Sequence, residues 1–543
     1  MLMRENIEKL VLKAIADLGI TASEQSIVKI AVTYPDPKLG DYASNAALIL
    51  AKEAKIKPLD LANKIVEKLD KSQFEKVEAA APGFINFKLN TEQLLPPATY
   101  DLKPKTTGKI LLEYFQPNIA KPLHMGLLRN VIIGDAIKRM LKFLGYKVES
   151  DTHMGDWGTQ FGFLILAKKK FGEVNEKLYA ELNADETQKE AAKQEFVNLE
   201  KGDKENRKIW QEIVDSSLKE FLKINDQMDI LPFDHHWPES FYQDKMSDIL
   251  EKLKTKKLLK ESQGAQIVNL ETQGLGIAVI VKSDTGTTYL LRDLATFIYR
   301  KEKFSKQLYV VDNRQSHVFK QLFAILKLLD EIKEAEAVHI DYGFISFKGE
   351  VLSTRKGNMI LAEDVITQAE EKVAKIIAEK NPDLKNKEHV IKAVTKSALK
   401  YFDLKHNRHS DIEFDWDEVL DFEGDSGPYL QYAYARLNSI LKKAGSEGEF
   451  SDIKFSDTER EILFKSSILA EVVEDAAKDY LPNILANYLF NFATLLNKFY
   501  HESPVTQEKD EDIRNFRLAL IAKAKGTLGR GLDLLGIEAL DEM

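Results

Sequence analysis

Apolar side chains recur at helical spacing over the first part of the chain, with charged residues between them. This pattern predicts helices over 3–18 and 42–70. The run GFINFKL at 83–89 is short and apolar, as in a strand. Proline and threonine are frequent in 89–109, which predicts a linker. Residues 1–95 are therefore expected to form a small α+β domain.

The pattern then changes to one in which strands and helices alternate. Residues 110–115 (ILLEYF) read as a strand, and a helical pattern follows that ends at Gly145, where a C-terminal cap belongs. KVESDT at 147–152 reads as a second strand. Strand, loop, helix and strand in this order predict the start of a parallel sheet in an α/β domain.

A long charged stretch separates this unit from further strands. Residues 167–260 are mostly helical in pattern and are interpreted as solvated helices. Strand-like runs return at 276–282, 308–312 and 338–347, so the helical stretch is predicted to be inserted between two halves of one sheet. From about residue 360 onward the pattern is helical to the C-terminus.

Composition narrows the class of protein. The chain has 543 residues, of which 44% are hydrophobic and 30% are charged, as in soluble globular proteins of several domains. Cysteine is absent, which excludes disulfides and thiolate metal sites and fits a reducing compartment. The sequence shows no secretory signal and no apolar run of the roughly 20 residues that cross a bilayer, so a cytoplasmic protein without a membrane partner is expected.

The net charge of −9 bears on nucleic-acid binding. Taken alone, it argues against such a partner. The argument is weak, because RNA is held by a local basic face that a global sum can hide.

The loop at 117–130 (PNIAKPLHMGLLRN) is the first segment with candidate chemistry. It lies between a predicted strand and a predicted helix, and a helix N-terminus favours phosphate through its unpaired N–H groups and partial positive charge. His124 can donate a hydrogen bond to a phosphate oxygen, and Gly126 lets a nucleotide approach the backbone. The alternative is a tight turn with an incidental histidine, which the short H-x-G pattern alone would favour.

A polar and basic segment at 349–361 (GEVLSTRKGNMIL) is the second candidate. Its hydroxyls and cations stand together, and such a group can neutralise a triphosphate and a pyrophosphate leaving group. A solvated basic turn is the alternative interpretation. The residues concerned are Ser353, Thr354, Arg355 and Lys356.

Several ordered motifs resemble the arginyl-tRNA synthetases, a family of class I aminoacyl-tRNA synthetases. The stretch from EYFQPNIAKPLHMG to GYKV, followed by HMGDWGTQFG, is similar to that family almost residue for residue, with His124–Leu127 at the place of its HIGH motif. Leu352–Arg355 stands at the place of its KMSKS motif, in the M-S-T-R form that the family uses. SGPYLQYAYAR at 426–436 and the ending at 531–543 are similar to its anticodon-binding region, and GDYASNAALILAK and APGFINF to its N-terminal domain.

The resemblance implies a multidomain protein with α/β and all-α parts. Residues 1–95 would be a tRNA-binding domain that contacts the D-loop, and 96–360 a Rossmann-type catalytic domain with a parallel sheet and a mainly helical insertion near 167–260. Residues 361–425 would be a connecting helical region, and 426–543 a helical bundle that binds the anticodon.

The implied reaction has two steps. The arginine carboxylate attacks the α-phosphate of ATP to give arginyl-adenylate and diphosphate, and the terminal ribose hydroxyl of tRNA(Arg) then takes the arginyl group and releases AMP. Mg²⁺ would accompany ATP through its phosphates, without a metal site made of protein groups alone. The implied partners are L-arginine, ATP and tRNA(Arg), and the chain is expected to act as a monomer.

The resemblance also assigns residues to these substrates. Those implied for catalysis and for ATP are Lys121, His124, Gly126, Ser353, Thr354, Arg355 and Lys356. Arginine recognition needs acceptors for a guanidinium fork and an anchor for the α-amino group. The residues implied for arginine are Glu113, Asn118, His124, Tyr289, Asp293 and Gln315. Without the family, Glu113 would be interpreted as a surface carboxylate at a strand end, and Tyr289 with Asp293 as an acidic helix start.

Four further residues are implied to contact tRNA. Phe84 and Asn86 match positions that meet the D-loop, where a ring stacks and an amide reads a base edge. Read alone, Phe84 would be a core residue. Tyr500 and Met543 match positions that approach the anticodon, where a tyrosine can stack on a base.

The sequence departs from the family pattern at the phosphate site. Leu127 replaces the second histidine of HIGH and cannot donate a hydrogen bond, a loss that typically costs ~2.7–4 kcal/mol. Thr354 stands where most KMSKS loops have a lysine, and the resemblance implies that Lys121 compensates. Two alternatives to a working synthetase follow. One is a tRNA-binding relative with an impaired ATP site, and the other is a small-molecule nucleotidyltransferase, against which the long helical C-terminal region argues.

Overall fold

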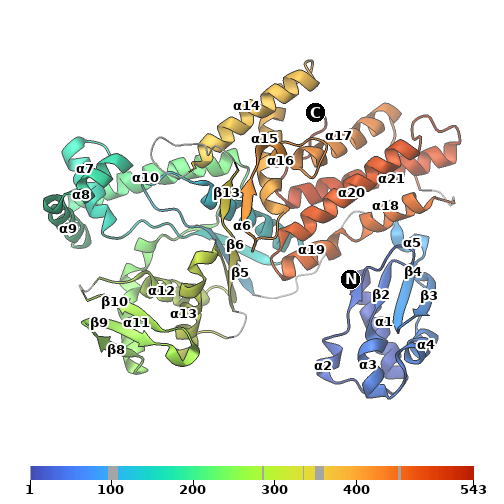
Figure 1. The fold of residues 1–543 in the computed structure, drawn as a ribbon, viewed down its shortest axis with the longest axis horizontal. Helices are drawn as coiled ribbons and strands as arrows, with labels where there is room; N and C mark the ends of the chain where they lie inside the picture. The colour runs from blue at the N-terminus through green and yellow to red at the C-terminus, as the bar shows by residue number, and fades with distance from the viewer. Residues whose placement is uncertain (1, 96–107, 284–285, 334–335, 349–359, 451–453) are drawn as a thin grey trace.

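The computed structural model describes residues 2–95, 108–283, 286–333, 336–348, 360–450 and 454–543. The described chain is elongated (Figure 1). An α/β domain lies in the middle, a helical insertion extends to one end, and the N-terminal domain lies beside C-terminal helices at the other. No helix within these ranges combines the length and the apolar character needed to span a membrane.

The N-terminal domain is an antiparallel sheet in the order β1-β2-β4-β3, with helices packed against it. The predicted helix over 42–70 is wrong at its start and in its middle. Its first residues form β2, and Lys55 takes a left-handed conformation with φ 54° that ends α3 before Pro58 starts α4. The elements are α1 (Met3–Asp17), α2 (Glu24–Ile27), β1 (Val32–Thr33), β2 (Tyr42–Ser44), α3 (Ala46–Ala54), α4 (Pro58–Lys68), β3 (Phe74–Ala80), β4 (Phe84–Leu89) and α5 (Thr91–Leu94).

The middle domain is built on a parallel sheet in the order β12-β11-β5-β6-β7. The chain starts at the central strand β5 and continues through β6 to β7 at one edge. It then returns to form β11 and β12 on the other side of β5. In such a sheet, ligands bind outside the carboxyl ends of the strands where the direction of winding reverses, here between β5 and β11. The strands are β5 (Lys109–Phe115), β6 (Lys147–Thr152), β7 (His235–His236), β11 (Lys306–Asp312) and β12 (Ala337–Tyr342).

Helix α6 (Met125–Phe143) connects β5 to β6 and is buried along most of its length. Gly134 allows it to lie directly on β5, because a Cβ atom there would come within 2.2 Å of the Tyr114 side chain. The chain leaves α6 through Gly145, whose φ is 82°, so the predicted C-terminal cap is confirmed. This close packing fixes the start of α6 relative to the carboxyl end of β5.

Two insertions interrupt the α/β domain, and they correct the single helical insertion predicted over 167–260. The first group of helices ends at Gln227, and the chain then returns to the central sheet as β7. The predicted strand at 276–282 belongs to a separate antiparallel sheet in the order β10-β9-β8. The first insertion comprises α7 (Gln160–Phe171), α8 (Glu176–Ala184), α9 (Glu186–Glu200) and α10 (Lys204–Gln227). The second comprises a 3-10 helix (Glu239–Lys245), α11 (Met246–Thr255), β8 (Leu259–Ser262), β9 (Ala265–Asn269), a 3-10 turn (Glu271–Gln273) and β10 (Ile277–Val281).

The rest of the chain is helical apart from one small sheet. The run predicted as a strand at 338–347 is divided after Tyr342, and its second part, β13 (Ile345–Phe347), pairs with β14 (Ile412–Phe414) in parallel. Helices α12 (Tyr289–Lys301) and α13 (Ser316–Leu328) flank β11, with a 3-10 turn (Asn313–Gln315) before α13. The later helices are α14 (Ala362–Lys380), α15 (Lys387–Leu404), α16 (Trp416–Val419), α17 (Gly427–Ala444), α18 (Asp457–Ser467), α19 (Leu469–Lys478), α20 (Pro482–Glu502) and α21 (Glu511–Leu534).

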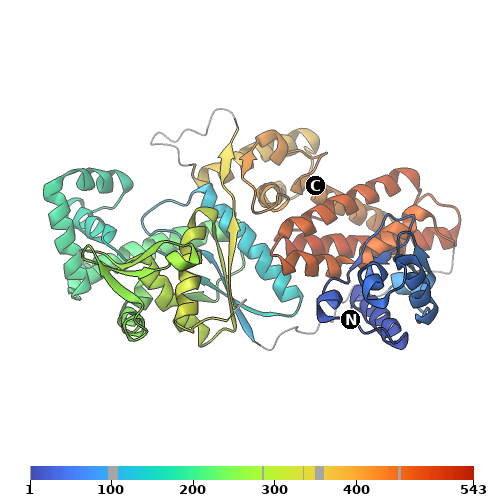
Figure 2. The same ribbon diagram turned by 60° about the horizontal axis from the view of Figure 1, so that its bottom comes forward.

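The N-terminal domain is docked on these later helices, and both ribbon views place it beside α18 (Figures 1 and 2). Glu471, which is 2% exposed, accepts hydrogen bonds from the hydroxyls of Tyr34 and Tyr42 at 2.8 and 3.1 Å. Arg460 on α18 pairs with both oxygens of Asp41 at 2.7 and 2.8 Å. The two ends of the sequence therefore meet in one interface.

Candidate active site

The turn between β5 and α6 places His124 at the carboxyl edge of the central sheet. His124 is the N-cap residue of α6, with extended backbone, and its ring makes no capping hydrogen bond. A Cβ atom on Gly126 would lie 3.1 Å from that ring, so glycine leaves the space beside the imidazole open. Burial and the positive charges of Arg314 and Lys121 lower the pKa of His124, which favours the neutral imidazole at pH 7. A neutral imidazole has one donor and one acceptor nitrogen, so His124 can donate to, or accept from, a ligand at the helix N-terminus.

Residues 360 and 362, at the end of the second candidate segment, are hydrogen-bonded to this turn. The Met125 N–H donates to the Ile360 carbonyl at 3.0 Å, and the Ala362 N–H donates to the Leu123 carbonyl at 2.9 Å. Ser353, Thr354, Arg355 and Lys356 lie outside the described residues. Of the second segment, the structure thus shows only that residues 360–362 pair with the histidine turn.

Lys121 and Leu127 lie on either side of His124. Lys121 is exposed and is held in the turn by a backbone hydrogen bond to Asn118 at 3.3 Å. Leu127 is half-buried and packs against the main hydrophobic core. The side chain that stands in place of a second histidine therefore points at least partly into the protein interior.

Glu113 at the end of β5 belongs to a buried chain of polar groups. One oxygen accepts a hydrogen bond from Gln116 at 3.0 Å, and the other pairs with the guanidinium of Arg300. Arg300 is fully buried and also contacts Asp151 on β6 at 2.5 Å. Asn130 on α6 donates to Gln116 at 2.6 Å. Both carboxylate oxygens of Glu113 are thus engaged within the protein.

Two carboxylates with raised pKa values, Asp293 on α12 and Glu239 in the second insertion, interact with each other. Asp293 lies one helical turn after Tyr289, and burial together with the negative charge of Glu113 raises its pKa to about 7. Glu239 is 8% exposed, and burial and the charge of Asp293 raise its pKa to about 8. Arg292, whose Nε lies 3.4 Å from Glu239, lowers both pKa values in part, and Arg300 also lowers that of Asp293. Burial outweighs these two cations, so both pKa values stay above their ordinary values.

Sequence reasoning did not find Glu239. Its backbone N–H donates to the Met154 carbonyl at 3.0 Å. The next residue, Ser240, donates from its N–H and hydroxyl to Asp156 at 2.8 and 2.6 Å. The segment HMGDWG therefore positions Glu239, and no local pattern in the sequence shows this.

Tyr289, Asn118 and Gln315 are the other residues predicted to bind arginine. Tyr289 is 59% exposed and stacks over the guanidinium of Arg292 at 4.6 Å. The backbone of Asn118 pairs with that of Gly155 in an isolated β-bridge. A Cβ atom on Gly155 would come within 2.6 Å of the side-chain oxygen of Asn118. Gln315 is exposed just after the end of β11. Asn118 follows β5 and Gln315 follows β11, so both lie beyond the carboxyl ends of these two neighbouring strands.

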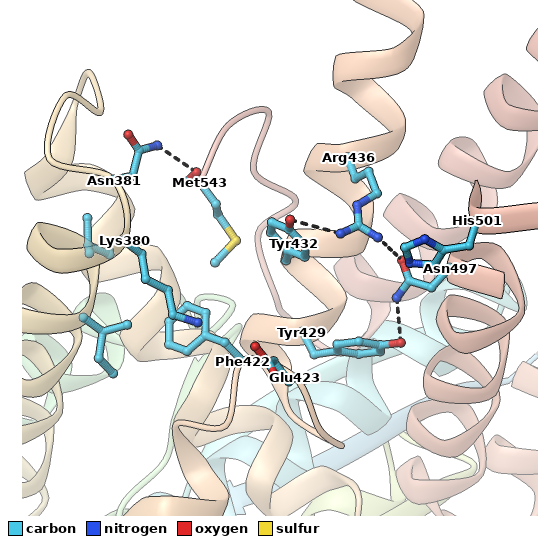
Figure 3. A pocket seen from close by; sticks show the side chains of 12 residues that line it. Lys380, Asn381, Phe422, Glu423, Tyr429, Tyr432, Arg436, Asn497, His501 and Met543 are labelled. Carbon is cyan, nitrogen blue, oxygen red and sulfur yellow. Dashed lines mark hydrogen bonds between the residues drawn. The ribbon is translucent and has the colours of Figure 1, made fainter. Parts of the chain in front are cut away.

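A second hollow lies among the C-terminal helices (Figure 3). It has a volume of 620 Å³ and is lined by Tyr429, Tyr432, Arg436 and His501, among others, together with Met543. An adjoining hollow of 570 Å³ is lined by both Tyr500 and Met543. Arg436 stacks between the rings of Tyr432 and Tyr500 at 4.7 and 4.9 Å. The structure thus brings the predicted pair Tyr500 and Met543 together, and adds an aromatic and cationic lining suited to a nucleobase.

Phe84 and Asn86 lie on one face of β4, opposite the buried Ile85 and Phe87. Phe84 is 36% exposed, so the interpretation as a core residue does not hold. Asn86 is 4% exposed and lies between neighbouring strands. Both belong to the N-terminal domain, away from the carboxyl ends of β5 and β11.

No group of three or more histidine, aspartate or glutamate side chains within the described parts of the chain is arranged to hold a metal ion.

Comparison with known proteins gives matches over the whole chain. Models for "tRNA synthetases class I (R), catalytic domain", the "DALR anticodon binding domain" and the "Arginyl tRNA synthetase N terminal domain" match residues 91–416, 430–543 and 5–89. An arginine–tRNA ligase of Streptococcus uberis is 38% identical over 562 residues, covering 98% of this chain and 99% of its own. One of Lactococcus lactis is 39% identical over 556 residues, covering 97% of each chain.

Solved structures agree with these matches. The arginyl-tRNA synthetase of Thermus thermophilus superposes with a TM-score of 0.85 at 26% identity, covering 100% of both chains. That of Plasmodium falciparum gives a TM-score of 0.84 at 25% identity, covering 100% of this chain and 99% of its own.

Proposed function

Since the chain belongs to the arginyl-tRNA synthetase family of class I aminoacyl-tRNA synthetases, we propose that it activates L-arginine with MgATP and transfers the arginyl group to tRNA(Arg). The arginine carboxylate attacks the α-phosphate of ATP and diphosphate leaves. The terminal ribose hydroxyl of the tRNA then attacks the arginyl carbonyl and AMP leaves. Mg²⁺ enters with ATP as part of the substrate.

Two buried carboxylates, Asp293 and Glu239, whose pKa values burial raises to about 7 and about 8, are the observation that carries the choice of arginine. A guanidinium presents several N–H donors in a fixed plane and remains protonated at all relevant pH values. Bound between these carboxylates, it adds a further positive charge and lowers both raised pKa values. The exposed ring of Tyr289 covers a planar cation from one side. Asn118 and Gln315 are placed to hold the α-amino end, and Glu113, through Arg300, supports the floor of the pocket.

The phosphates of ATP belong at the N-terminus of α6. The helix dipole, the neutral imidazole of His124 and the open space at Gly126 suit a charged oxygen there. Lys121 and the segment with Ser353, Thr354, Arg355 and Lys356 supply the cations that balance diphosphate as it leaves. Catalysis then rests on positioning and on stabilisation of charge, without a covalent enzyme intermediate.

The four regions of the chain have separate roles in this proposal. Residues 1–95 bind the D-loop through Phe84 and Asn86, 96–360 form the catalytic domain, 361–425 connect it, and 426–543 bind the anticodon through Tyr500, Arg436 and Met543. The protein acts as a cytoplasmic monomer. The tRNA-binding relative without catalysis is not supported, because the catalytic-domain model and full-length ligases match this chain.

Arginine-dependent exchange between ATP and labelled diphosphate, with and without tRNA(Arg), tests the function. Exchange with arginine and no other amino acid is the expected result. Folded protein that binds the tRNA but shows no exchange under any condition would contradict the enzymatic role.

A further inference from the structure

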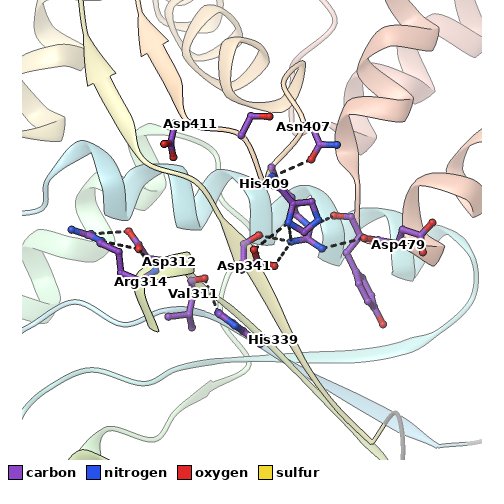
Figure 4. A network of polar contacts seen from close by, with 12 residues as sticks. Val311, Asp312, Arg314, His339, Asp341, Asn407, His409, Asp411 and Asp479 are labelled. Atoms are coloured by element: carbon purple, nitrogen blue, oxygen red, sulfur yellow. Dashed lines mark hydrogen bonds and ion pairs between the residues drawn. The ribbon is translucent and has the colours of Figure 1, made fainter. Parts of the chain in front are cut away.

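Arg314 is a cation just beyond the end of β11, the strand that pairs with β5 in the central sheet. Its Nε and Nη2 atoms donate to the two carboxylate oxygens of Asp312 at 2.8 and 2.7 Å (Figure 4). Its backbone N–H donates to the same carboxylate at 2.8 Å. The side chain is nevertheless 69% exposed. The guanidinium is therefore oriented by the protein and still open to a ligand.

The pair with Asp312 leaves one edge of this guanidinium unused. A guanidinium carries five N–H donors, of which Asp312 takes two. Nη1 makes no hydrogen bond to the part of the chain that the structure describes. The remaining donors have the fork geometry that suits two oxygens of a phosphate. Because Asp312 already fixes the plane of the group, less freedom is lost when a phosphate binds.

Packing contacts place Arg314 near the start of α6. Its guanidinium carbon lies 5.8 Å from the centre of the Phe344 ring. The carbonyl of Phe344 accepts a hydrogen bond from Arg129, in the first two turns of α6, at 3.1 Å. The hydroxyl of Tyr342 donates to the carbonyl of Gly126 at 3.3 Å. The end of β12, over which Arg314 lies, is thus attached to the proposed phosphate site.

The electrostatics of His124 agree with this placement. Arg314 has the largest effect of the charged groups that shift the pKa of His124, ahead of Asp312 and Lys121. Arg314 and Lys121 lower this pKa, and Asp312 raises it. Because charge interactions weaken with distance, the guanidinium must lie near the imidazole. An anion at the N-terminus of α6 would therefore be attracted by Arg314 as well as by Lys121.

The start of α6 lacks a donor that Arg314 can supply. Leu127 packs on the core and has no polar atom in its side chain, so the histidine turn offers one imidazole. The fork of Arg314 could instead clamp the α-carboxylate of arginine. That carboxylate must keep an oxygen free to attack phosphorus, however, and a bidentate clamp would engage both oxygens. A phosphate is therefore the better ligand for Arg314.

We propose that Arg314 is a catalytic residue that donates to a non-bridging oxygen of the α-phosphate of ATP, which Leu127 cannot do. The inference rests on the proposed function. As the carboxylate oxygen of arginine bonds to phosphorus, the bond from phosphorus to the bridging oxygen of diphosphate breaks, and its electron pair leaves with diphosphate. Arg314 stays protonated and stabilises the charge on the oxygens that remain on phosphorus.

The first experiment measures single-turnover formation of adenylate by the full-length protein with saturating arginine, MgATP and tRNA(Arg). Arg314→Ala should lower the rate by about a hundredfold and leave KM for arginine within about twofold. Arg314→Lys should lose about tenfold, because lysine keeps the charge but not the fork. Lys256→Ala is the matched control. It removes the cation of another exposed ion pair in the same domain, with Asp330 at 2.6 Å, and should leave the rate unchanged.

A double variant separates the lost donor from the carboxylate that its loss uncovers. Arg314→Ala leaves Asp312 unpaired, and this negative charge would repel a phosphate. Combining Arg314→Ala with Asp312→Asn removes both charges. We expect the double variant to remain at least about thirtyfold slower than Asp312→Asn alone. Equal rates for the two would show that repulsion, and not a missing donor, slows the alanine variant, and would overturn the proposal.

Sulfur substitution tests the contact with the α-phosphate itself. Replacing one non-bridging α-oxygen of ATP by sulfur gives two diastereomers, and one of them places sulfur at the Arg314 position. We expect the ratio of their adenylation rates to change by at least about fivefold between the wild type and Arg314→Ala, since sulfur accepts hydrogen bonds poorly. A purely structural defect would slow both diastereomers equally, and that result would overturn the proposal.

The position of Arg314 can be checked without any activity. Histidine NMR of the free protein, assigned with His124→Ala, gives the pKa of His124. Arg314→Ala should raise it, because a nearby positive charge is removed, whereas Lys256→Ala should not. An unchanged pKa would overturn the inference. A higher KM for arginine at an unchanged adenylation rate would assign Arg314 to the arginine carboxylate and would also overturn it. No adenylate from the wild type would overturn the proposed function instead.

Discussion

The side of the site that we propose for arginine consists of buried carboxylates on hydrogen-bonded segments, whereas the side proposed for phosphate includes backbone groups and the exposed Lys121. Asp293 and Glu239 are held by α12 and by hydrogen bonds from the HMGDWG segment, and burial raises the pKa of each. On the phosphate side, His124 occupies the N-cap position of α6, and Lys121 is exposed to solvent. The difference indicates that selectivity resides in the arginine side, where an unpaired charge is costly, and that the other side can tolerate substitutions such as Leu127.

The largest effect is expected from the arginine side. Asp293→Asn removes one charge that the guanidinium neutralises while keeping the shape of the side chain. We expect kcat/KM for arginine to fall by about a thousandfold, with KM for ATP little changed, because breaking a buried charge pair commonly costs 2–5 kcal/mol or more. Exchange kinetics at varied arginine measure this. Asp512→Asn, on an exposed first turn of α21, is the control, and a loss below about tenfold would place the guanidinium elsewhere.

A smaller effect is expected at the phosphate side, and in a different kinetic parameter. His124→Ala removes a donor that acts as charge develops on the α-phosphate. We expect kcat to fall by about a hundredfold while KM for arginine stays within about twofold. Pre-steady-state formation of adenylate at saturating arginine and MgATP measures the step directly. A rise in KM for arginine without loss of kcat would assign His124 to binding instead.

The pH dependence of arginine binding compares the two sides in the unmodified protein. Arginine needs both carboxylates ionised, and in the free protein their pKa values are raised to about 7 and about 8. Lowering the pH through this range protonates them, so KM for arginine should rise, by about tenfold or more between pH 8.5 and 6.5. KM for ATP should change little over the same interval. An arginine KM that is flat with pH would show that the carboxylates are ionised without ligand.

The smallest effect is expected for Leu127→His. Leu127 packs on the core, so an imidazole there must leave that contact before it can reach a phosphate. We therefore expect kcat of exchange to change by no more than about threefold, since the phosphate side already has His124, Lys121 and the helix N-terminus. A rise above tenfold in exchange assays would show that this side lacks a donor, and would weaken the contrast drawn above.

The sequence was sufficient for elements whose signal is local. Strands β5 and β6 and the cap of α6 at Gly145 follow from apolar runs and one glycine, and they are confirmed. The motif around His124 could be located because its interpretation as a phosphate site requires only a strand end before it and a helix start after it, and both have local sequence signals. These are the parts of the site in which neighbours in sequence are also neighbours in space.

The remainder depends on contacts between distant segments. A strand pattern does not name its partner, so residues 276–282 were assigned to the central sheet although they form β10 of another. Glu239 could not be found from the sequence, because its neighbours in space are distant along the chain. Its pKa is raised by burial and by the charges of Asp293, 54 positions away, and Asp156. The partners of Glu113 were likewise hidden, since Arg300 lies on α12 and reaches it only in the folded sheet.

The docking of the N-terminal domain on α18 and α19 has a consequence for synthesis of the chain. Tyr42 and Asp41 are complete early, whereas Arg460 and Glu471 are added some hundreds of residues later. At the usual 5–20 residues per second, roughly 20–75 s pass between the end of the N-terminal domain and the arrival of its partner helices. During that interval the nascent domain lacks the partners that Tyr34 and Tyr42 contact in the folded protein, Glu471 and Phe464. The N-terminal domain can therefore dock on α18 and α19 only after the catalytic domain between them has been synthesised.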